Sequence, residues 1–213
     1  MLTIQTLYRF TYISVGSQGC ESDGGIFASS DLAALLRRQQ EVGDVLPPPK
    51  ALPNTTEAVP YFLVGDEAFP LKPNLMRPYA RASLAGPEAD QRRIFNYRMS
   101  RARRCVENAF GIMAQRWRIY RGTVGCAPDK VALMVKATCA LHNLLRQRDI
   151  NAAGSAMVPA ECRLDAVPAL QSIGRVGTNT HSREAARVRQ AVTCYVNGVG
   201  SVPWQRSAAG LDQ

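Results

Sequence analysis

The sequence has few of the residues that hold zinc and related metals, since its 213 residues include only two histidines and six scattered cysteines. No two cysteines lie within four residues of each other, which excludes the paired CxxC spacing of zinc sites. The two histidines, His142 and His181, also lie far apart. We expect isolated buried thiols, because a disulfide framework is typical of smaller secreted chains. The cysteines are Cys20, Cys105, Cys126, Cys139, Cys162 and Cys194.

Long apolar runs are also missing from the sequence. The longest ones are short and are interrupted by Arg, Asp or Pro, so no membrane-spanning helix is predicted. The N-terminal segment lacks the charged start and the apolar block of a signal peptide. Low-complexity tracts and internal repeats are absent, and a hydrophobic fraction of 46% suits a globular chain. These absences favour the nucleus or the cytosol as the location.

Acidic residues are scarce in the second part of the chain. Residues 1–91 hold 7 Lys and Arg against 10 Asp and Glu, a net charge of −3, whereas residues 92–213 hold 19 against 7, a net charge of +12. This asymmetry predicts a surface that attracts a polyanion such as nucleic acid. A basic, solvated surface without a specific partner is the alternative that charge alone leaves open.

The first part of the chain is predicted to form short elements. Aromatic and branched residues indicate strands at 2–6 and 10–16, and Asp23-Gly24-Gly25 indicates a turn. A helix is predicted over 31–40, with Ser29 or Ser30 as its N-cap. The apolar run 61–64 has the form of a strand that is buried on both faces.

Two long helices are predicted in the second part of the chain, at 96–117 and 128–148, from apolar residues at steps of three and four. A linker rich in Ala, Gly and Ser follows at 150–181, and a weaker helix at 182–196. The inner face of the first long helix is predicted to be Met99, Ala102, Val106, Ala109, Phe110, Met113 and Trp117. That of the second is predicted to be Val131, Met134, Thr138, Leu141 and Leu145.

Two carboxylates are candidates for chemistry: Asp66, just beyond the strand 61–64, and Glu107, on the first long helix. Metal-assisted cleavage of a phosphodiester needs carboxylates from separate elements that meet at one point. Mg²⁺ takes hard oxygen ligands, so two or three carboxylates suffice. Spacing alone leaves the ordinary alternatives open, in which the Asp is a turn residue and the Glu is half of a solvated ion pair.

Five segments of the sequence carry a resemblance to a known family. They read FTYISVGSQGCESDGGIF (10–27), YFLVGDEAFPLKPNLMRPY (61–79), FNYRMSRARRCVENAFGIMAQRWRIYR (95–121), ATCALHNLLR (137–146) and EAARVRQAVTCYVNGVGSVPWQ (184–205). Over these segments the chain closely resembles the PIF/Harbinger-type DDE transposases and the nucleases derived from them. The resemblance is poor at about 150–180.

The resemblance implies an α/β, ribonuclease-H-like fold with an Asp–Asp–Glu site for a divalent metal ion, Mg²⁺ or Mn²⁺. Asp66, in GDEAFP, takes the position of the family's second aspartate, and Glu107, in RRCVENAFG, that of the glutamate. Asp23, in SDGGIF, matches a further acid of the family and is a third candidate metal ligand. We expect the carboxyl groups of Asp66 and Glu107 to lie within roughly 4–8 Å of each other.

The first aspartate of the family lies in an Asp-Gly-Thr-His-like motif, and this sequence contains no such motif. By the ribonuclease-H pattern, the strand that carries it is the middle one of the sheet. We therefore expect a partial endonuclease domain over 1–149, with exposed strand edges, and a helical tail over 182–213 after the linker. The chain as it stands is expected to be a poor nuclease.

The expected function is that of a metal-dependent DNA endonuclease or transposase, which hydrolyses phosphodiesters or transfers strands. The alternative is a non-catalytic transposon remnant, or a domesticated module that binds DNA or protein. The expected partners are DNA and, by the resemblance, a separate Myb-like DNA-binding protein, with no membrane. The nucleus is the favoured location, with the cytoplasm as a second one.

Arginines dominate the first long helix and the residues after it, since residues 92–121 contain nine Arg and one acid. We expect this segment to follow DNA phosphates, with a solvated basic face as the alternative. Trp117 is expected in the core, and His142 and Asn143 in a packing or capping role rather than as metal ligands. The residues expected to contact DNA are Arg101, Arg103, Arg104 and Arg118.

Overall fold

The computed structural model describes residues 2–4, 7–17, 21–153 and 182–211, and it divides the chain into two compact units. The first unit consists of Met1–Glu21 and Arg104–Leu170, and the second of Ser22–Arg103 and Gln171–Gln213. Helix α3 (Ala89–Arg116) contributes its first part to the second unit and its last part to the first unit. Most of the predicted linker, from residue 154 to residue 181, lies outside the described residues.

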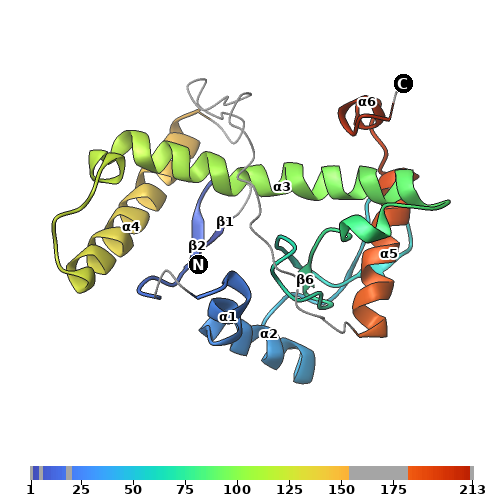
Figure 1. The fold of residues 1–213 in the computed structure, drawn as a ribbon, viewed down its shortest axis with the longest axis horizontal. Helices are drawn as coiled ribbons and strands as arrows, with labels where there is room; N and C mark the ends of the chain where they lie inside the picture. Colours follow the sequence, from blue (N-terminus) through green and yellow to red (C-terminus); the bar gives the residue numbers. More distant parts are fainter. Residues whose placement is uncertain (1, 5–6, 18–20, 154–181, 212–213) are drawn as a thin grey trace. The chain divides into compact units, whose positions relative to one another are not determined.

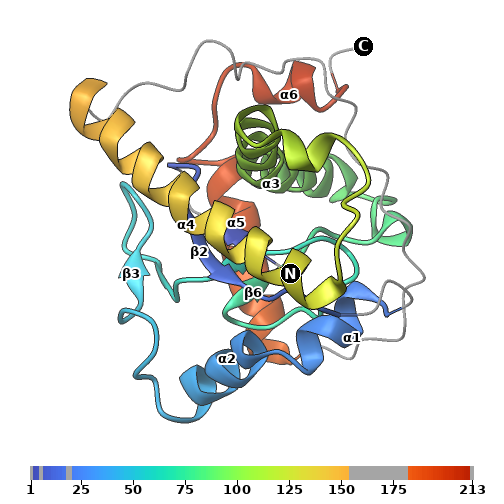
Figure 2. The ribbon, with the colours of Figure 1, turned by 90° about the vertical axis from the view of Figure 1, so that its left-hand side faces the viewer.

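The first unit combines a strand pair with two helices. Strands β1 (Leu2–Ile4) and β2 (Phe10–Ile13) pair antiparallel, so the predicted strands are confirmed but are shorter than expected. The 3-10 helix η2 (Arg118–Arg121) follows α3 and leads to helix α4 (Pro128–Ala153). Figure 2 shows α4 lying over β2.

The second unit begins with two capped helices, α1 (Asp23–Ala28) and α2 (Asp31–Glu41). The hydroxyl of Ser22 accepts a hydrogen bond from the Gly25 N–H, and the hydroxyl of Ser30 accepts one from the Ala33 N–H. These are the N-cap bonds that serine favours. The predicted helix at 31–40 and one of its two candidate caps are therefore confirmed.

Short strands and further helices complete the second unit. Strand β3 (Lys50–Ala51) pairs antiparallel with β4 (Ala58–Val59), and β5 (Leu63–Val64) pairs parallel with β6 (Leu75–Met76). The helical elements after β6 are the 3-10 helix η1 (Arg81–Ser83), the first part of α3, α5 (Arg183–Asn197) and α6 (Gln205–Ala208).

The core of the second unit forms where α5 crosses the first part of α3 (Figure 1). Phe95 and Met76 are fully buried, and α5 contributes Val188, Val192 and Val196 at steps of four residues. This spacing puts the three valines on one face of α5. Full burial of a side chain of this size stabilises the fold by about 1.5–3 kcal/mol. The predicted C-terminal helix therefore contributes to a core.

Polar side chains of α4 hold the backbone around β2 in the first unit. His142 Nε2 lies 2.7 Å from the carbonyl oxygen of Tyr8. The Asn143 side chain accepts a hydrogen bond from the Phe10 N–H and donates one to the Phe10 carbonyl, both at 2.8 Å. These contacts satisfy backbone groups that a neighbouring strand would otherwise pair. The packing role predicted for His142 and Asn143 is thereby confirmed.

The buried face of α4 differs from the predicted one. Thr138 is buried as expected, but Met134 and Leu141 are 37% and 48% exposed, and Leu133 and Leu144 are more exposed still. Helix α4 directs polar side chains inward because they form hydrogen bonds to the backbone at residues 7–10. The residues that it buries besides Thr138 are Cys139, His142 and Arg146.

Three other predictions need correction. Residues 23–25 form the first turn of α1 instead of a loop turn. The predicted strand at 61–64 shortens to β5, whose residues are half-buried, and Tyr61 is 43% exposed. Helix α3 begins at Ala89, and Phe110 on its predicted inner stripe is 38% exposed, whereas Ile112 is buried.

The strands of the described residues form three separate two-stranded sheets. The parallel β5–β6 pair is typical of α/β proteins. The larger sheet of a ribonuclease-H-like fold is not present among the residues that the structure covers, so this assignment rests on the family resemblance. None of the described helices is long and apolar enough to cross a membrane.

The described cysteines are free thiols, as expected, but they are not all buried. Cys139 is buried and Cys105 is half-buried, and burial raises the pKa of both thiols and so disfavours the reactive thiolate. Cys126 and Cys194 are exposed. Cys20 and Cys162 lie outside the described residues.

Candidate functional site

Asp66 lies in a tight turn directly after strand β5. The N–H of Gly65 donates to the carbonyl of Met76 at 2.8 Å and so continues the contact with β6. A Cβ atom at Gly65 would lie 3.1 Å from the side chain of Phe69, so the turn favours glycine for this close approach. One carboxylate oxygen of Asp66 accepts a hydrogen bond from the Ala68 N–H at 2.9 Å. The carboxylate therefore has a defined orientation at the end of the strand.

The other carboxylate oxygen of Asp66 faces a guanidinium group of α3. Oδ2 of Asp66 lies 3.6 Å from a terminal nitrogen of Arg103, and the two side chains are 20% and 36% exposed. A pair at this exposure contributes about 0.2–1 kcal/mol to stability. Arg103, which we predicted to contact DNA, thus contacts a candidate metal ligand.

Helix α1 packs against the same turn and brings Asp23 into this part of the second unit. The rings of Phe27 and Phe69 meet edge to face with 5.6 Å between their centroids. A Cβ atom at Gly24 would lie 2.9 Å from the carbonyl oxygen of Ala68, so the backbone of α1 approaches the turn closely. Asp23 precedes this glycine and is exposed to solvent.

A residue that the sequence did not single out, Arg77, follows strand β6 directly and supports the turn. Its guanidinium group donates to the carbonyl oxygens of Glu67 and Phe69, both at 3.3 Å. Arg77 lies within the segment 61–79 that resembles the transposase family, but nothing in its spacing indicated this role. The turn that carries Asp66 is therefore held by α1, by the side chain of Arg77 and by its own backbone.

Glu107 lies on the part of α3 that belongs to the first unit. It is half-buried, and within the described residues its side chain makes no hydrogen bond or ion pair. The next residue, Asn108, donates to the hydroxyl of Tyr8 at 3.4 Å. Because Asp66 belongs to the second unit, the convergence of the two carboxylates stays a prediction.

The arginines predicted to bind DNA differ in their surroundings. Arg104 and Arg118 are exposed, and neither has a polar partner in the part of the chain that the structure describes. Arg101 is exposed as well, but its guanidinium carbon lies 4.3 Å from the centroid of the Trp204 ring. The ring of Tyr97 meets Trp204 edge to face with 6.1 Å between the centroids. Three of the four predicted arginines thus present charge at the surface.

Trp204 is a further candidate that sequence reasoning passed over. It is 41% exposed, and Arg98 lies 5.8 Å from its ring centroid on the same surface as Arg101. An arginine close to the face of an exposed indole forms a cation–π contact. The motif VPWQ, at the end of the family-like segment 184–205, was the available signal.

The side chains that suit a divalent metal ion here are carboxylates. Within the residues covered by the structure, no group of three or more His, Cys, Asp or Glu side chains lies close enough to hold a metal ion. His142 is occupied with the Tyr8 carbonyl, and burial lowers its pKa. The oxygen donors of Asp66 and Asp23 fit Mg²⁺ or Mn²⁺, and a cation at Oδ2 of Asp66 would replace the contact with Arg103.

Comparisons with known proteins identify a family for this chain. Residues 1–143 match a protein family described as DDE superfamily endonuclease. The Arabidopsis thaliana protein ALP1-like is 31% identical over 140 residues, which make up 64% of this chain and 32% of that protein. The alignment thus spans about a third of the length of this relative. No solved structure matches the chain.

Proposed function

Because the chain belongs to the DDE superfamily endonucleases, a transposase-derived nuclease family, we propose that it serves in metal-dependent cleavage or transfer of DNA strands. Enzymes of this superfamily generally use divalent metal ions. The family-like motifs, from GDEAFP to RRCVENAFG, favour the PIF/Harbinger type. The observation that carries the proposal is the Asp66 carboxylate, which the Gly65 turn and the Ala68 N–H orient at the end of a parallel strand.

Each candidate residue has a chemical role in this proposal. Asp66, Glu107 and Asp23 are the carboxylates that would hold Mg²⁺ or Mn²⁺, which when bound supplies Lewis-acid stabilisation of the phosphate and an activated water or 3′-hydroxyl. Arg103 neutralises the Asp66 carboxylate. The exposed arginines of α3 and η2 provide positive charge for the phosphate backbone, whose binding releases counterions.

Metal binding and cleavage by matched variants test the proposal. Mn²⁺ affinity, measured by calorimetry, should fall at least about tenfold in Asp66→Asn and in Glu107→Gln, because each substitution removes a charged ligand. Asp129→Asn, at an exposed position in the first turn of α4, is the control and should bind Mn²⁺ as the wild type does. Plasmid cleavage that needs Mn²⁺ and disappears in Asp66→Ala would show that this chain is sufficient for catalysis.

A non-catalytic DNA-binding module is the second candidate function. The ion pair of Asp66 with Arg103 favours it, since this pair stabilises the carboxylate without a metal ion. In that case Asp66→Asn and Glu107→Gln would leave Mn²⁺ binding unchanged while duplex DNA still binds. For either function we propose the nucleus as the location, with the cytoplasm as a second one, and a Myb-like protein that reads the DNA sequence as the partner.

A further inference from the structure

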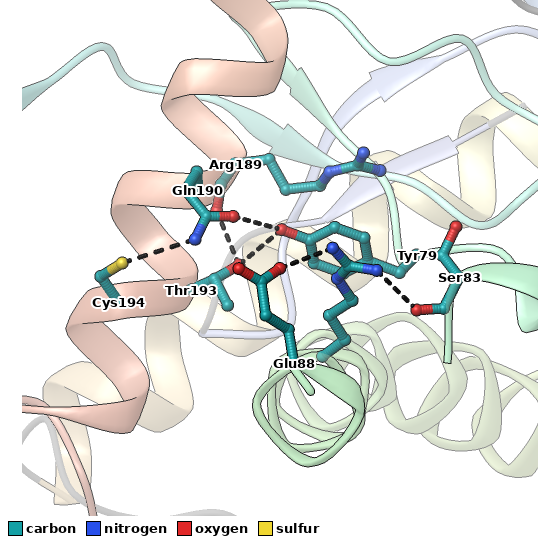
Figure 3. A network of polar contacts seen from close by, with 8 residues as sticks. Tyr79, Ser83, Glu88, Arg189, Gln190, Thr193 and Cys194 are labelled. Atoms are coloured by element: carbon teal, nitrogen blue, oxygen red, sulfur yellow. Dashed lines mark hydrogen bonds and ion pairs between the residues drawn. The ribbon is translucent and has the colours of Figure 1, made fainter. Parts of the chain in front are cut away.

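Two arginine side chains lie against the ring of Tyr79, which follows strand β6 in the second unit. The guanidinium carbon of Arg189 lies 4.0 Å from the centroid of the Tyr79 ring, and that of Arg92 lies 5.3 Å from it. The Tyr79 hydroxyl contacts the Thr193 hydroxyl at 3.0 Å and the Gln190 side chain at 3.2 Å, which fixes the ring (Figure 3). Figure 3 also shows the side chain of Arg189 reaching from α5 across this ring.

The positive charges around Tyr79 are only partly balanced. Arg92 forms an ion pair with Glu88 at 2.6 Å and donates to the carbonyl of Ser83 at 2.8 Å. Arg77 donates to two backbone carbonyls of the turn that carries Asp66, and these are neutral groups. Throughout the described part of the chain, neither Arg77 nor Arg189 has an acidic side chain within ion-pair distance. Two of the three guanidinium groups therefore lack a counter-charge.

The absence of a counter-charge is unfavourable because parts of these guanidinium groups are buried. The Nε atoms of Arg92 and Arg189 are buried without a hydrogen-bond partner. Burial lowers the pKa of Arg189, and the neighbouring charges of Arg77 and Arg92 lower it too, against the opposing effect of Tyr79. A buried charge is stable only when it is paired or when its N–H groups are satisfied. An anion between these side chains would supply both.

We propose that Arg92 and Arg189, which lie against the Tyr79 ring, form a binding site for a phosphate group, and that Arg77, two residues before Tyr79 in the sequence, adds positive charge to it. Guanidinium groups suit phosphate because their parallel N–H groups match two of its oxygens at once. Arg77 connects the site to the Asp66 turn, so a phosphate bound here occupies the same unit as that candidate metal ligand. The phosphate is either free or part of a DNA backbone, and the second source rests on the proposed function.

Thermal unfolding in inorganic phosphate tests the site itself. The melting temperature of the wild type should rise by about 3–6 °C at a phosphate concentration of roughly ten times the Kd. Chloride and acetate at the same ionic strength should give no such rise. Arg189→Met should lose the effect, whereas Arg183→Met, at an exposed position on the same helix, should keep it. An equal rise for Arg189→Met, or with acetate, would overturn the proposal.

The melting temperature of Arg189→Met without phosphate shows whether a lost phosphate effect comes from lost binding or from a damaged fold. Methionine keeps an apolar stem and removes an unneutralised charge, so without phosphate this variant should melt at or above the wild-type temperature. Arg189→Lys, which keeps the charge but not the paired N–H groups, should bind phosphate roughly tenfold more weakly. A strong fall in the melting temperature of Arg189→Met without phosphate would show a structural role and contradict the site.

Duplex binding distinguishes the two sources of phosphate. If the ligand is the DNA backbone, Arg189→Met should bind a duplex several-fold more weakly than Arg183→Met, and its salt slope should be smaller by about one. If only the phosphate effect is lost and both variants bind the duplex equally, the ligand is free phosphate. Asp66→Asn should keep the phosphate effect, so a failure of the proposed nuclease function would leave this site standing.

Discussion

Asp66 and Arg103 are joined by an ion pair at the end of strand β5, with 3.6 Å between the carboxylate and guanidinium groups. Thirty-seven positions separate the two residues in the sequence; the family resemblance suggests a role for Asp66, and the density of arginine in 92–121 suggests one for Arg103. The pair links a candidate metal ligand to a candidate phosphate ligand. A divalent cation and Arg103 would therefore compete for the same oxygen of Asp66.

This competition predicts that Arg103→Gln strengthens Mn²⁺ binding. A partly exposed pair is worth about 0.2–1 kcal/mol, so the affinity should rise at most about fivefold, and the free energy of unfolding should fall by no more than about 1 kcal/mol. Arg104→Gln, the adjacent exposed arginine, is the matched control for a general change in charge. Calorimetric titration that gives the same affinity for both variants would contradict a direct contact.

Duplex DNA binding should be strongly dependent on salt and independent of sequence. With three to five neutralised phosphates, at about −0.9 in log–log slope for each, affinity should drop on the order of a hundredfold from ~50 to ~200 mM salt. Arg101→Ala/Arg104→Ala should lower both the affinity and the slope. An affinity that does not change with salt, or a double variant that binds as well as the wild type, would show that these arginines are solvated and do not bind DNA phosphates.

The buried imidazole of His142 should make stability depend on pH. Burial is the largest cause that lowers its pKa, and the bond to the Tyr8 carbonyl opposes it only in part. A pKa lowered by folding means that the unfolded chain binds the proton more readily. Stability is therefore complete above the ordinary pKa of about 6.5 and falls as the pH drops below it, by at most about 1.4 kcal/mol per pH unit.

Urea unfolding at pH 7.5, 6.5 and 5.5 measures this contribution of His142. His142→Gln should be less stable than the wild type at pH 7.5, because it disturbs a fully buried hydrogen bond, by about 1–3 kcal/mol. Its stability should change less than that of the wild type between pH 7.5 and pH 5.5. Parallel pH profiles for the two proteins would show that another group is responsible.

The close approach of α1 to the Asp66 turn predicts a difference between two neighbouring glycines. Gly24→Ala should be destabilising, because its Cβ would lie 2.9 Å from the backbone oxygen of Ala68. Gly25→Ala meets only the Ser22 hydroxyl, at 3.2 Å, and gains about 0.5–1 kcal/mol of helix propensity, so it should be near neutral. The melting temperatures of the two variants test this difference, and equal melting temperatures would exclude tight packing at Ala68.

Local patterns in the sequence predicted the approximate positions of the longer helices and of the first strand pair. The periodicity of apolar residues predicted α3 and α4, a serine cap marked the start of α2, and branched residues marked β1 and β2. These features depend on residues a few positions apart, so they can be found along a single chain. The motif around Asp66 was also found in this way, because it follows an apolar run directly.

Contacts between distant segments decided the rest. Helix α4 buries His142 and exposes Leu141, since the backbone around β2, more than a hundred residues earlier, needs hydrogen-bond partners there. Arg103 pairs with Asp66, and Arg189 lies over Tyr79, although helical periodicity describes both arginines only as charged positions on a helix. The sequence by itself therefore determined the positions of α2, α3, α4 and α5 and which acids resemble a metal site. Only the tertiary structure decided which side chains neutralise one another, because charge balance depends on distances in space.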